Sequence, residues 1–286
     1  MNIRNGEALL STIKKQTIAK NPKLETIPNK NSFDTFFCGM RNRLKKHLPN
    51  AITCANLFSG CVGIVLAFKG ELIAASYAIF LSAIFDFFDG LASRVLKSFS
   101  GIGKDLDSLA DMVSFGVLPA VIMYQIFLEA RQIGNVSSWL NFIAFLIPVF
   151  SALRLAKFNV DSRQAENFIG LPTPANAILI ASFPIIISHS NRFYLPFLLN
   201  PYVLSGLVVV MCSLLVAELP MMSLKFKNSD FNENIYRYLL LLFSAILILF
   251  FKFAAVPVVI LIYITLSIIQ FKIANETVMS SQQKDE

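Results

Sequence analysis

Four aspartates lie at helical spacing in an otherwise apolar part of the chain. Asp86 and Asp89 are three residues apart. Asp107 and Asp111 are four apart, so each pair falls on one face of a helix. Asp105 falls off this spacing. Ionised carboxylates that converge from two helices repel one another unless cations lie among them. The spacing therefore predicts a metal site, and oxygen ligands favour a hard ion such as Mg²⁺ or Mn²⁺.

The composition is that of a polytopic membrane protein. Of 286 residues, 55% are hydrophobic and only 15% are charged, and the mean hydropathy is +0.62. The net charge of +7 is uneven, because residues 1–47 hold ten Lys and Arg against three Asp and Glu, and the remainder holds fifteen of each. The four cysteines form no CxxC motif, and we interpret them as buried thiols without a disulfide or zinc role.

Apolar segments long enough to cross about 30 Å of hydrocarbon as helices predict an all-α, polytopic membrane helix bundle with about eight transmembrane helices. The predicted spans are 49–68, 72–93, 106–129, 138–158, 173–190, 201–218, 235–251 and 254–272. Only Lys252 and its neighbours separate the last two, so a tight turn is required there. Four prolines inside these spans, Pro119, Pro148, Pro184 and Pro257, predict kinks.

The block of apolar spans and the polar segments before and after it divide the chain into four parts. Residues 1–32 are predicted to be a flexible basic N-terminal arm, and 33–47 an amphipathic juxtamembrane segment. Its interleaved aromatic and basic side chains suit an anionic membrane surface, or serve equally well as a topology signal alone. Residues 48–273 form the transmembrane domain, and 274–286 a polar C-terminal tail.

The distribution of basic residues predicts the orientation. With the N-terminal arm in the cytoplasm, 21 Lys and Arg lie on that side, and the opposite side keeps only Lys69, Arg131, Arg192 and Lys252. The positive-inside rule therefore predicts that both termini are cytoplasmic. The four aspartates then lie at the cytoplasmic mouth of the second and third spans, where soluble nucleotides and metal ions can reach them.

The aspartates belong to a longer pattern, Asp86-x2-Asp89-Gly90-x2-Ser93-Arg94-x8-Gly103-x3-Asp107-x3-Asp111. This pattern resembles the signature of the CDP-alcohol phosphatidyltransferases, with Ser93 where alanine is usual. Further stretches are similar to the branch of type II phosphatidylserine synthases; they are residues 48–60, 109–116, 152–159 and 170–176. Lys157 stands where that branch has arginine, which keeps the charge but loses a bidentate fork.

The resemblance implies a reaction: transfer of the phosphatidyl group from CDP-diacylglycerol to L-serine, with release of CMP. It also implies two divalent metal ions, Mg²⁺ or Mn²⁺, bridged by Asp86 and Asp107. Asp89 would complete the coordination of one ion. Asp111 would contact the other ion and would also take the proton from the serine hydroxyl. A multi-pass enzyme of a bacterial cytoplasmic membrane is expected, as a homodimer in the lipid bilayer, with the active site facing the cytoplasm and no nucleic-acid partner.

Candidates for holding the CDP portion of the lipid surround the aspartates; they are Thr53, Asn56, Gly90, Arg94, Ser100 and Gly103. The two glycines let a nucleotide approach the backbone, and Arg94 offers paired donors to phosphate. Ser108 and Ser114 flank the acids, and bonding to the helix backbone explains them equally well.

Arg154 and Lys157 are candidates for binding the acceptor or a lipid phosphate, although the same charges could mark topology alone. Asn159 and the 170–176 loop are further candidates for shaping the acceptor pocket.

Two alternatives stay open at this point. Another acceptor, glycerol 3-phosphate or inositol phosphate, would need a richer cluster of Arg and Lys than Arg154 and Lys157 supply. A cation-coupled transporter could also use intramembrane acids, but it would not require Gly90, Arg94 and Gly103 at these intervals.

Overall fold

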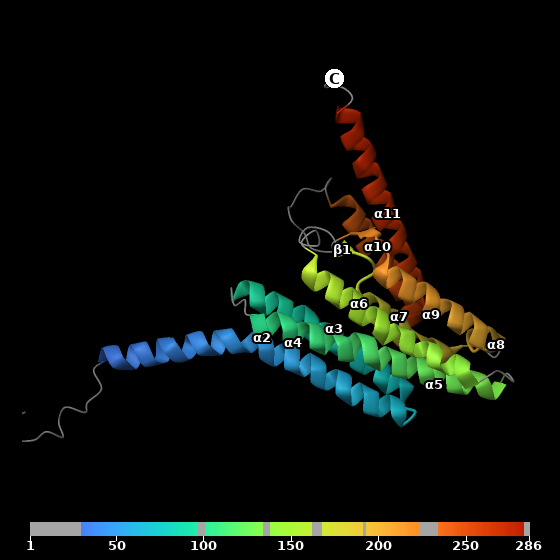
Figure 1. Cartoon of the computed structure of the whole chain (residues 1–286), viewed down its shortest axis with the longest axis horizontal. Helices are drawn as coiled ribbons and strands as arrows, with labels where there is room; N and C mark the ends of the chain where they lie inside the picture. Colours follow the sequence, from blue (N-terminus) through green and yellow to red (C-terminus); the bar gives the residue numbers. More distant parts are fainter. Residues whose placement is uncertain are drawn as a thin grey trace, which may run out of the picture. The chain divides into compact units, whose positions relative to one another are not determined.

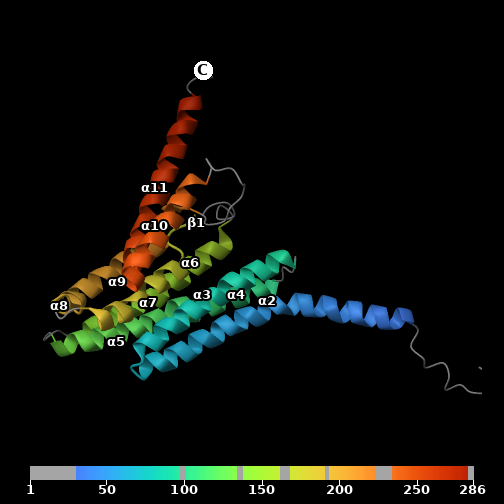
Figure 2. The same cartoon turned by 180° about the vertical axis from the view of Figure 1, so that it is seen from behind.

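The fold is built almost entirely from helices (Figures 1 and 2). A computed structural model describes residues 30–96, 101–133, 138–161, 168–190, 193–222 and 234–282. Ser100 and most of the arm, 1–29, lie outside these residues, as do the side chains of 30–46 on which the amphipathic prediction rests. The predicted all-α class is confirmed. The membrane helices belong to the second of two compact units, Leu48–Glu286.

The elements follow one another in a simple order, with two short strands among the helices. They are α2 (Lys30–Phe68), α3 (Leu72–Val95), α4 (Gly101–Asp111), the π-helix η2 (Met112–Val117), α5 (Leu118–Ile133), the 3₁₀-helix η3 (Ser138–Phe145), α6 (Leu146–Val160), β1 (Phe168–Ile169), α7 (Thr173–His189), α8 (Leu195–Leu198), α9 (Pro201–Val216), β2 (Pro220–Met221), α10 (Ile235–Phe251), η5 (Lys252–Ala254) and α11 (Ala255–Gln282).

Each of the eight predicted segments lies in helical structure. By length and apolar composition, five helical stretches of the described chain could cross a bilayer: His47–Phe68, Leu72–Val95, Gly101–Arg131, Trp139–Val160 and Ile235–Lys272. The last stretch contains both α10 and α11, and α7 and α9 are apolar but shorter. The number eight therefore stays a prediction, whereas the helical nature of all eight segments is confirmed.

Helix ends differ from the predicted boundaries where polar residues continue a helix. α4 begins at Gly101, before the predicted start at 106, and α11 continues to Gln282, into the predicted polar tail. Lys252 follows α10 with a φ of 51°, and α10 packs against α11, so the chain does reverse at the predicted turn. Hydropathy marks where a membrane segment begins, not where backbone hydrogen bonding begins.

Three of the four prolines in the predicted spans lie where the helix type changes. Pro119, Pro148 and Pro257 fall in the first turns of α5, α6 and α11, directly after η2, η3 and η5. A first turn tolerates proline because its N–H groups have no partner within that helix. Of these four, Pro184 alone lies well inside its α-helix, α7.

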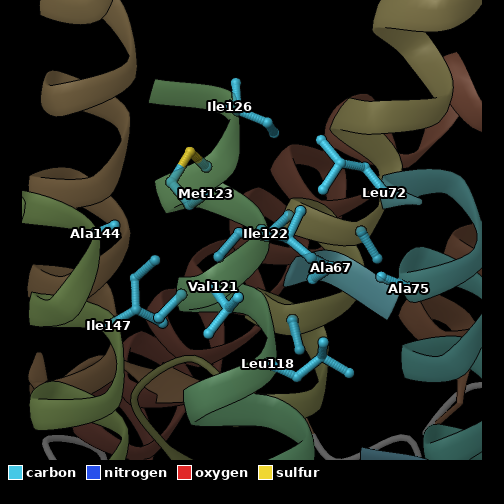
Figure 3. Packing of buried hydrophobic residues seen from close by; sticks show 14 of the residues in the cluster. Ala67, Leu72, Ala75, Leu118, Val121, Ile122, Met123, Ile126, Ala144 and Ile147 are labelled. Atoms are coloured by element: carbon cyan, nitrogen blue, oxygen red, sulfur yellow. The ribbon is translucent and has the colours of Figure 1, made fainter. Parts of the chain in front are cut away.

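Helix α5 lies at the centre of the bundle and carries much of its apolar core. It contacts α3, α6, α7 and α9. Figure 3 shows its side chains meeting those of neighbouring helices; the labelled residues are Ala67, Leu72, Ala75, Leu118, Val121, Ile122, Met123, Ile126, Ala144 and Ile147. The stretch Gly101–Arg131 is the most buried of the five, and the α10–α11 stretch is the least buried. Gly101–Arg131 is also the stretch that carries Asp107 and Asp111, near its start.

A two-stranded antiparallel ladder, which the sequence did not predict, fixes the start of α7. Phe168 pairs with Met221 and Ile169 with Pro220. Gly170 follows with a φ of +77°, and a Cβ there would lie 2.5 Å from the carbonyl oxygen of Leu215. The left-handed conformation and the close approach both require glycine. The ladder therefore ties the first residues of α7 to the end of α9.

The cysteine interpretation holds in part. Cys54, Cys61 and Cys212 are free thiols, as expected, but only Cys212 is buried. Cys54 and Cys61 lie on a face of α2 that no other described helix covers. Apolar surroundings in the sequence therefore did not mean burial inside the protein, because a membrane helix can turn apolar residues outward to lipid.

Candidate active site

Three of the four predicted metal-binding aspartates come together. One carboxylate oxygen from each of Asp86, Asp89 and Asp107 lies within 4.8 Å of the other two. Asp86 and Asp89 lie on the last turns of α3, and Asp107 lies on α4. Asp111 is outside this trio but close enough to interact electrostatically with all three. We call these four residues the acidic cluster.

The donor set of the acidic cluster fits a divalent cation. Asp89 and Asp111 are only 6% and 8% exposed. One oxygen of Asp89 and one of Asp107 are buried without a hydrogen-bond partner. Buried carboxylate oxygens are costly unless something positive or a proton donor faces them. The same oxygens are the ligands that hard divalent ions prefer.

Asn56 of α2 joins the acidic cluster through Asp111. Its Nδ2 donates a hydrogen bond to Oδ1 of Asp111 at 3.3 Å. Its backbone carbonyl accepts hydrogen bonds from the hydroxyls of Ser82, at 3.2 Å, and Ser114, at 3.1 Å. Gly60 permits this approach, since a Cβ there would lie 2.4 Å from Oγ of Ser114. The helices α2, α3 and η2 therefore meet at Asn56 and fix its amide against Asp111.

A π-helix begins directly after Asp111 and turns the following residues inward. Met112–Val117 is π-helical, and Ser114, Phe115 and Gly116 within it are buried. Such wide turns are rare and occur frequently at functional sites. Here the turn lets Ser114 reach the carbonyl of Asn56 on another helix, whereas Ser108 bonds within its own helix, to the carbonyl of Lys104. Both serines therefore donate to backbone carbonyls, Ser108 within its own helix and Ser114 to a carbonyl on another helix.

The candidate residues for binding the CDP portion differ in burial and in the helix that carries them. Thr53 is buried, donates to the carbonyl of Pro49 at 3.0 Å, and lies beside the Asp89 carboxylate. Arg94 is exposed in the last turn of α3. A Cβ at Gly90 would meet nothing within 4 Å, so its backbone borders open space beside the acids. Gly103 lies in the first turn of α4.

The structure separates Arg154 from Lys157, which the sequence treated as a pair. Arg154 is 7% exposed, donates from Nη1 to Oγ1 of Thr173 at 3.3 Å, and interacts electrostatically with Asp111. Its guanidinium also lies over the Phe158 ring, 5.9 Å from the centroid. Lys157 is exposed. Arg154 therefore joins the acidic cluster from α6, and Lys157 does not.

A cavity of about 510 Å³ lies between the end of α6 and the end of α9. Its charged lining residues are Arg154, Lys157, Asp161 and Glu218. Of these four, Arg154 is buried, Asp161 is half-buried, and Lys157 and Glu218 are exposed. The cavity therefore leads from a rim that carries both signs of charge to a buried guanidinium.

Asn159 bonds to α4 through both its side chain and its backbone carbonyl. Its Nδ2 donates to Oγ of Ser108 at 2.8 Å, and its carbonyl accepts from Nζ of Lys104 at 3.0 Å. These two bonds tie the end of α6 to α4, on either side of the turn that carries Asp107. Asn159 therefore positions the acidic helix and does not line the cavity.

Comparison with known proteins agrees with the motif. The sequence profile of the CDP-alcohol phosphatidyltransferases matches residues 46–226, which contain every residue of the site described above. The chain belongs to the CDP-alcohol phosphatidyltransferase family. With the family's membrane helices and the apolar stretches above, this makes it an integral membrane protein.

Among related members of this family, an archaetidylserine synthase of Methanothermobacter thermautotrophicus is 37% identical over 48% of this chain and 57% of its own length. A CDP-diacylglycerol--serine O-phosphatidyltransferase of Helicobacter pylori is 28% identical over 70% of this chain and 81% of its own. One from Bacillus subtilis is 33% identical over 48% of this chain and 76% of its own.

Several residues near Arg154 were not singled out from the sequence. Thr173 bonds to Arg154, and Ser151 and Asn176 are completely buried near it. Asn176 lay only within the loop expected to shape the acceptor pocket, and Ser151 carried no signal. A buried polar residue in an apolar helix was the one available hint, and such residues are common in membrane helices.

Proposed function

We propose that this phosphatidyltransferase transfers the phosphatidyl group from CDP-diacylglycerol to L-serine and releases CMP. The observation that carries the proposal is the acidic cluster, built on the family motif, with the buried Arg154 beside Asp111. A single buried cation suits an acceptor that carries one carboxylate. The three relatives, two named as serine O-phosphatidyltransferases and one as an archaetidylserine synthase, support the same acceptor.

The residues that would hold metal are Asp86, Asp89 and Asp107, with Asp111 beside them. In this proposal Asp86, Asp89, Asp107 and Asp111 would together hold two divalent ions. Two divalent ions, when bound, neutralise charge on the transferred phosphoryl group and on the leaving CMP oxygen. Thr53, Gly90, Arg94 and Gly103 line the approach for the CDP portion.

Asp111 acts as the general base. Its carboxylate accepts the proton of the serine hydroxyl, whose oxygen forms a bond to the phosphorus that carries the diacylglycerol. The bond from that phosphorus to the CMP oxygen breaks, and CMP leaves with the electron pair. Asn56 holds one oxygen of Asp111 through its amide, which leaves the other oxygen to accept the proton. Arg154 binds the serine carboxylate, and Lys157 attracts anions at the rim of the cavity.

The proposal includes a place in the cell. The excess of Lys and Arg on one side favours cytoplasmic termini and a cytoplasmic active site, in a bacterial inner membrane. CDP-diacylglycerol would enter from the bilayer and serine from the cytoplasm. A homodimer is the proposed assembly, by similarity to the family.

The test is CMP release by the detergent-purified protein supplied with CDP-diacylglycerol and Mn²⁺ or Mg²⁺. L-serine, glycerol 3-phosphate and inositol phosphate are compared as acceptors, with Asp111→Asn alongside. We expect metal-dependent release with L-serine only, and a loss of at least about 10³-fold in Asp111→Asn. Release with another acceptor would retain the family chemistry and reject serine. No release with any acceptor, from folded protein, would favour the transporter alternative.

A further inference from the structure

Buried polar atoms without partners concentrate in two places. Eight such side-chain atoms occur in the described residues, and three belong to Asn56, Asp89 and Asp107 around the acidic cluster. Four of the other five belong to a second group on α6 and α7: Oγ of Ser151, Nε of Arg154, and both Oδ1 and Nδ2 of Asn176. Native proteins pair nearly all buried polar groups, so a concentration of unpaired ones needs an explanation.

The second group is divided between α6 and α7, which one hydrogen bond of Arg154 joins, and we call it, together with Thr173, the α6–α7 polar cluster. Ser151 and Arg154 lie one turn apart on α6, and Thr173 and Asn176 lie one turn apart on α7. The hydrogen bond from Arg154 to Thr173 joins the two helices at 3.3 Å. Ser151 and Asn176 are both 0% exposed, so no bulk water reaches them.

The α6–α7 polar cluster adjoins the proposed base. A Cβ added at Gly116 of η2 would lie 3.3 Å from the Cβ of Ser151, so Ser151 faces the π-helix that begins after Asp111. Arg154 interacts electrostatically with Asp111 itself. The α7 N-terminus, where Thr173 and Asn176 lie, also favours a negative group through its dipole.

The unpaired atoms of this cluster include both donors and acceptors. Nε of Arg154 and Nδ2 of Asn176 are donors, Oδ1 of Asn176 is an acceptor, and the Ser151 hydroxyl is both. An amino acid presents a carboxylate that accepts and an ammonium that donates. A phosphorylated polyol has no ammonium and carries a second negative charge, which this cluster, with its single cation, does not match.

We propose that Asn176, with Ser151 and Arg154, recognises the carboxylate and ammonium groups of the amino-acid acceptor and so selects an amino acid over phosphorylated acceptors. This inference rests on the proposed function, and it adds the residues that set acceptor choice. Nδ2 of Asn176 and Nε of Arg154 bind the carboxylate, and Oδ1 of Asn176 and Oγ of Ser151 accept from the ammonium. The acceptor hydroxyl then points to Asp111.

The cavity at the end of α6 offers the route of entry. Its rim carries Lys157, Asp161 and Glu218, and its buried end carries Arg154. A rim with both signs of charge admits a zwitterion more readily than a dianion, because each of its charges finds an opposite one.

The experiment uses Asn176→Leu, which keeps the number and branching of the side-chain heavy atoms and removes both polar atoms. Asn141→Leu is the matched control, because Asn141 is a buried asparagine of η3, about 20 Å along the chain of helices from Arg154. In Asn176→Leu, we expect the KM for L-serine to rise by about tenfold or more, with the KM for CDP-diacylglycerol unchanged. In Asn141→Leu, we expect both constants to stay near the wild-type values.

A second readout separates binding from structure. Because the polar atoms of Asn176 and Ser151 lack partners, Asn176→Leu and Ser151→Ala should keep or raise the unfolding temperature without acceptor. With CMP and Mn²⁺ present, we expect serine to raise the unfolding temperature of the wild type, and we expect both variants to lose this rise. Ser151→Ala removes one oxygen, and it carries the test if Asn176→Leu does not fold.

The outcomes distinguish this inference from the proposed function. Serine-dependent CMP release by the wild type, with an unchanged serine KM in both Asn176→Leu and Ser151→Ala, would overturn the inference alone. CMP release by the wild type only with glycerol 3-phosphate or inositol phosphate would overturn the inference and the serine assignment together.

Discussion

The acidic cluster and the α6–α7 polar cluster differ in chemistry and in depth. The acidic cluster holds only acceptors, on helices that follow one another in the chain, and Gly90 beside it borders open space. The α6–α7 polar cluster is rich in donors, and Ser151 and Asn176 within it are completely buried. Both keep buried atoms without partners. The difference fits the proposed division of labour, in which the acids activate the diphosphate and the other cluster chooses the acceptor.

If this division is correct, loss of an acid should abolish transfer to every acceptor. In Asp107→Asn, kcat should fall by at least about 10³-fold, because a neutral amide cannot offset metal charge beside the phosphoryl group. CMP release and Mn²⁺ binding followed by electron paramagnetic resonance measure the two effects.

Asp105→Asn is the control for that substitution, since Asp105 is exposed, two residues away on the same helix. It should stay within about twofold of the wild type, as surface substitutions usually do. Equal losses in the two variants would mean that net charge, rather than the convergence of particular carboxylates, supports the reaction.

A smaller loss, confined to the acceptor, is expected on α6. Arg154→Gln should lower kcat/KM for L-serine by roughly a hundredfold, because a buried charge-assisted hydrogen bond is lost. The KM for CDP-diacylglycerol should not change. Steady-state kinetics with each substrate varied in turn provide the measurement.

Lys157→Gln is the companion variant, and we expect a smaller loss of activity from it because the Lys157 ammonium is exposed. It should lower kcat/KM for L-serine by only about threefold, less at high salt, because exposed charges are screened. A loss in Lys157→Gln as large as that in Arg154→Gln would place the acceptor in the outer cavity instead of beside Asp111.

An effect smaller than that of Arg154→Gln is expected at the contact that positions Asp111. Ser114→Ala removes the hydroxyl that bonds to the carbonyl of Asn56 and should lower kcat by roughly tenfold and stability by about 1 kcal/mol. Ser182→Ala is the control, because Ser182 is equally buried but bonds within its own helix, to Leu179. A kcat in Ser114→Ala equal to that in Ser182→Ala would show that the Ser114 hydroxyl does not help to position Asp111.

The acidic cluster could be predicted from the sequence because its geometry is local. The helical period places Asp86 with Asp89 and Asp107 with Asp111, and a short connection between α3 and α4 brings the pairs together. The same rule failed to place Asp111 in the closest trio. The relative rotation of two helices depends on packing, which the spacing within each helix does not encode.

The α6–α7 polar cluster could not be predicted because its contacts are not local. Asn176 and Ser151 come from separate helices and depend on the β1–β2 ladder and on η2 for their positions. The π-helical turn itself has no composition that marks it. Arg154 and Lys157, three residues apart, were expected to act together, but only Arg154 falls on the covered side of α6.

The most direct test of the transfer to serine follows the oxygen of the acceptor. The purified protein is given CDP-diacylglycerol, Mn²⁺ and L-serine labelled with ¹⁸O in its side-chain hydroxyl, and the products are analysed by mass spectrometry. The account predicts phosphatidylserine that keeps the label and CMP without it, since the serine oxygen forms the new bond to phosphorus. Labelled CMP, or CMP release without any labelled phosphatidylserine, would contradict it.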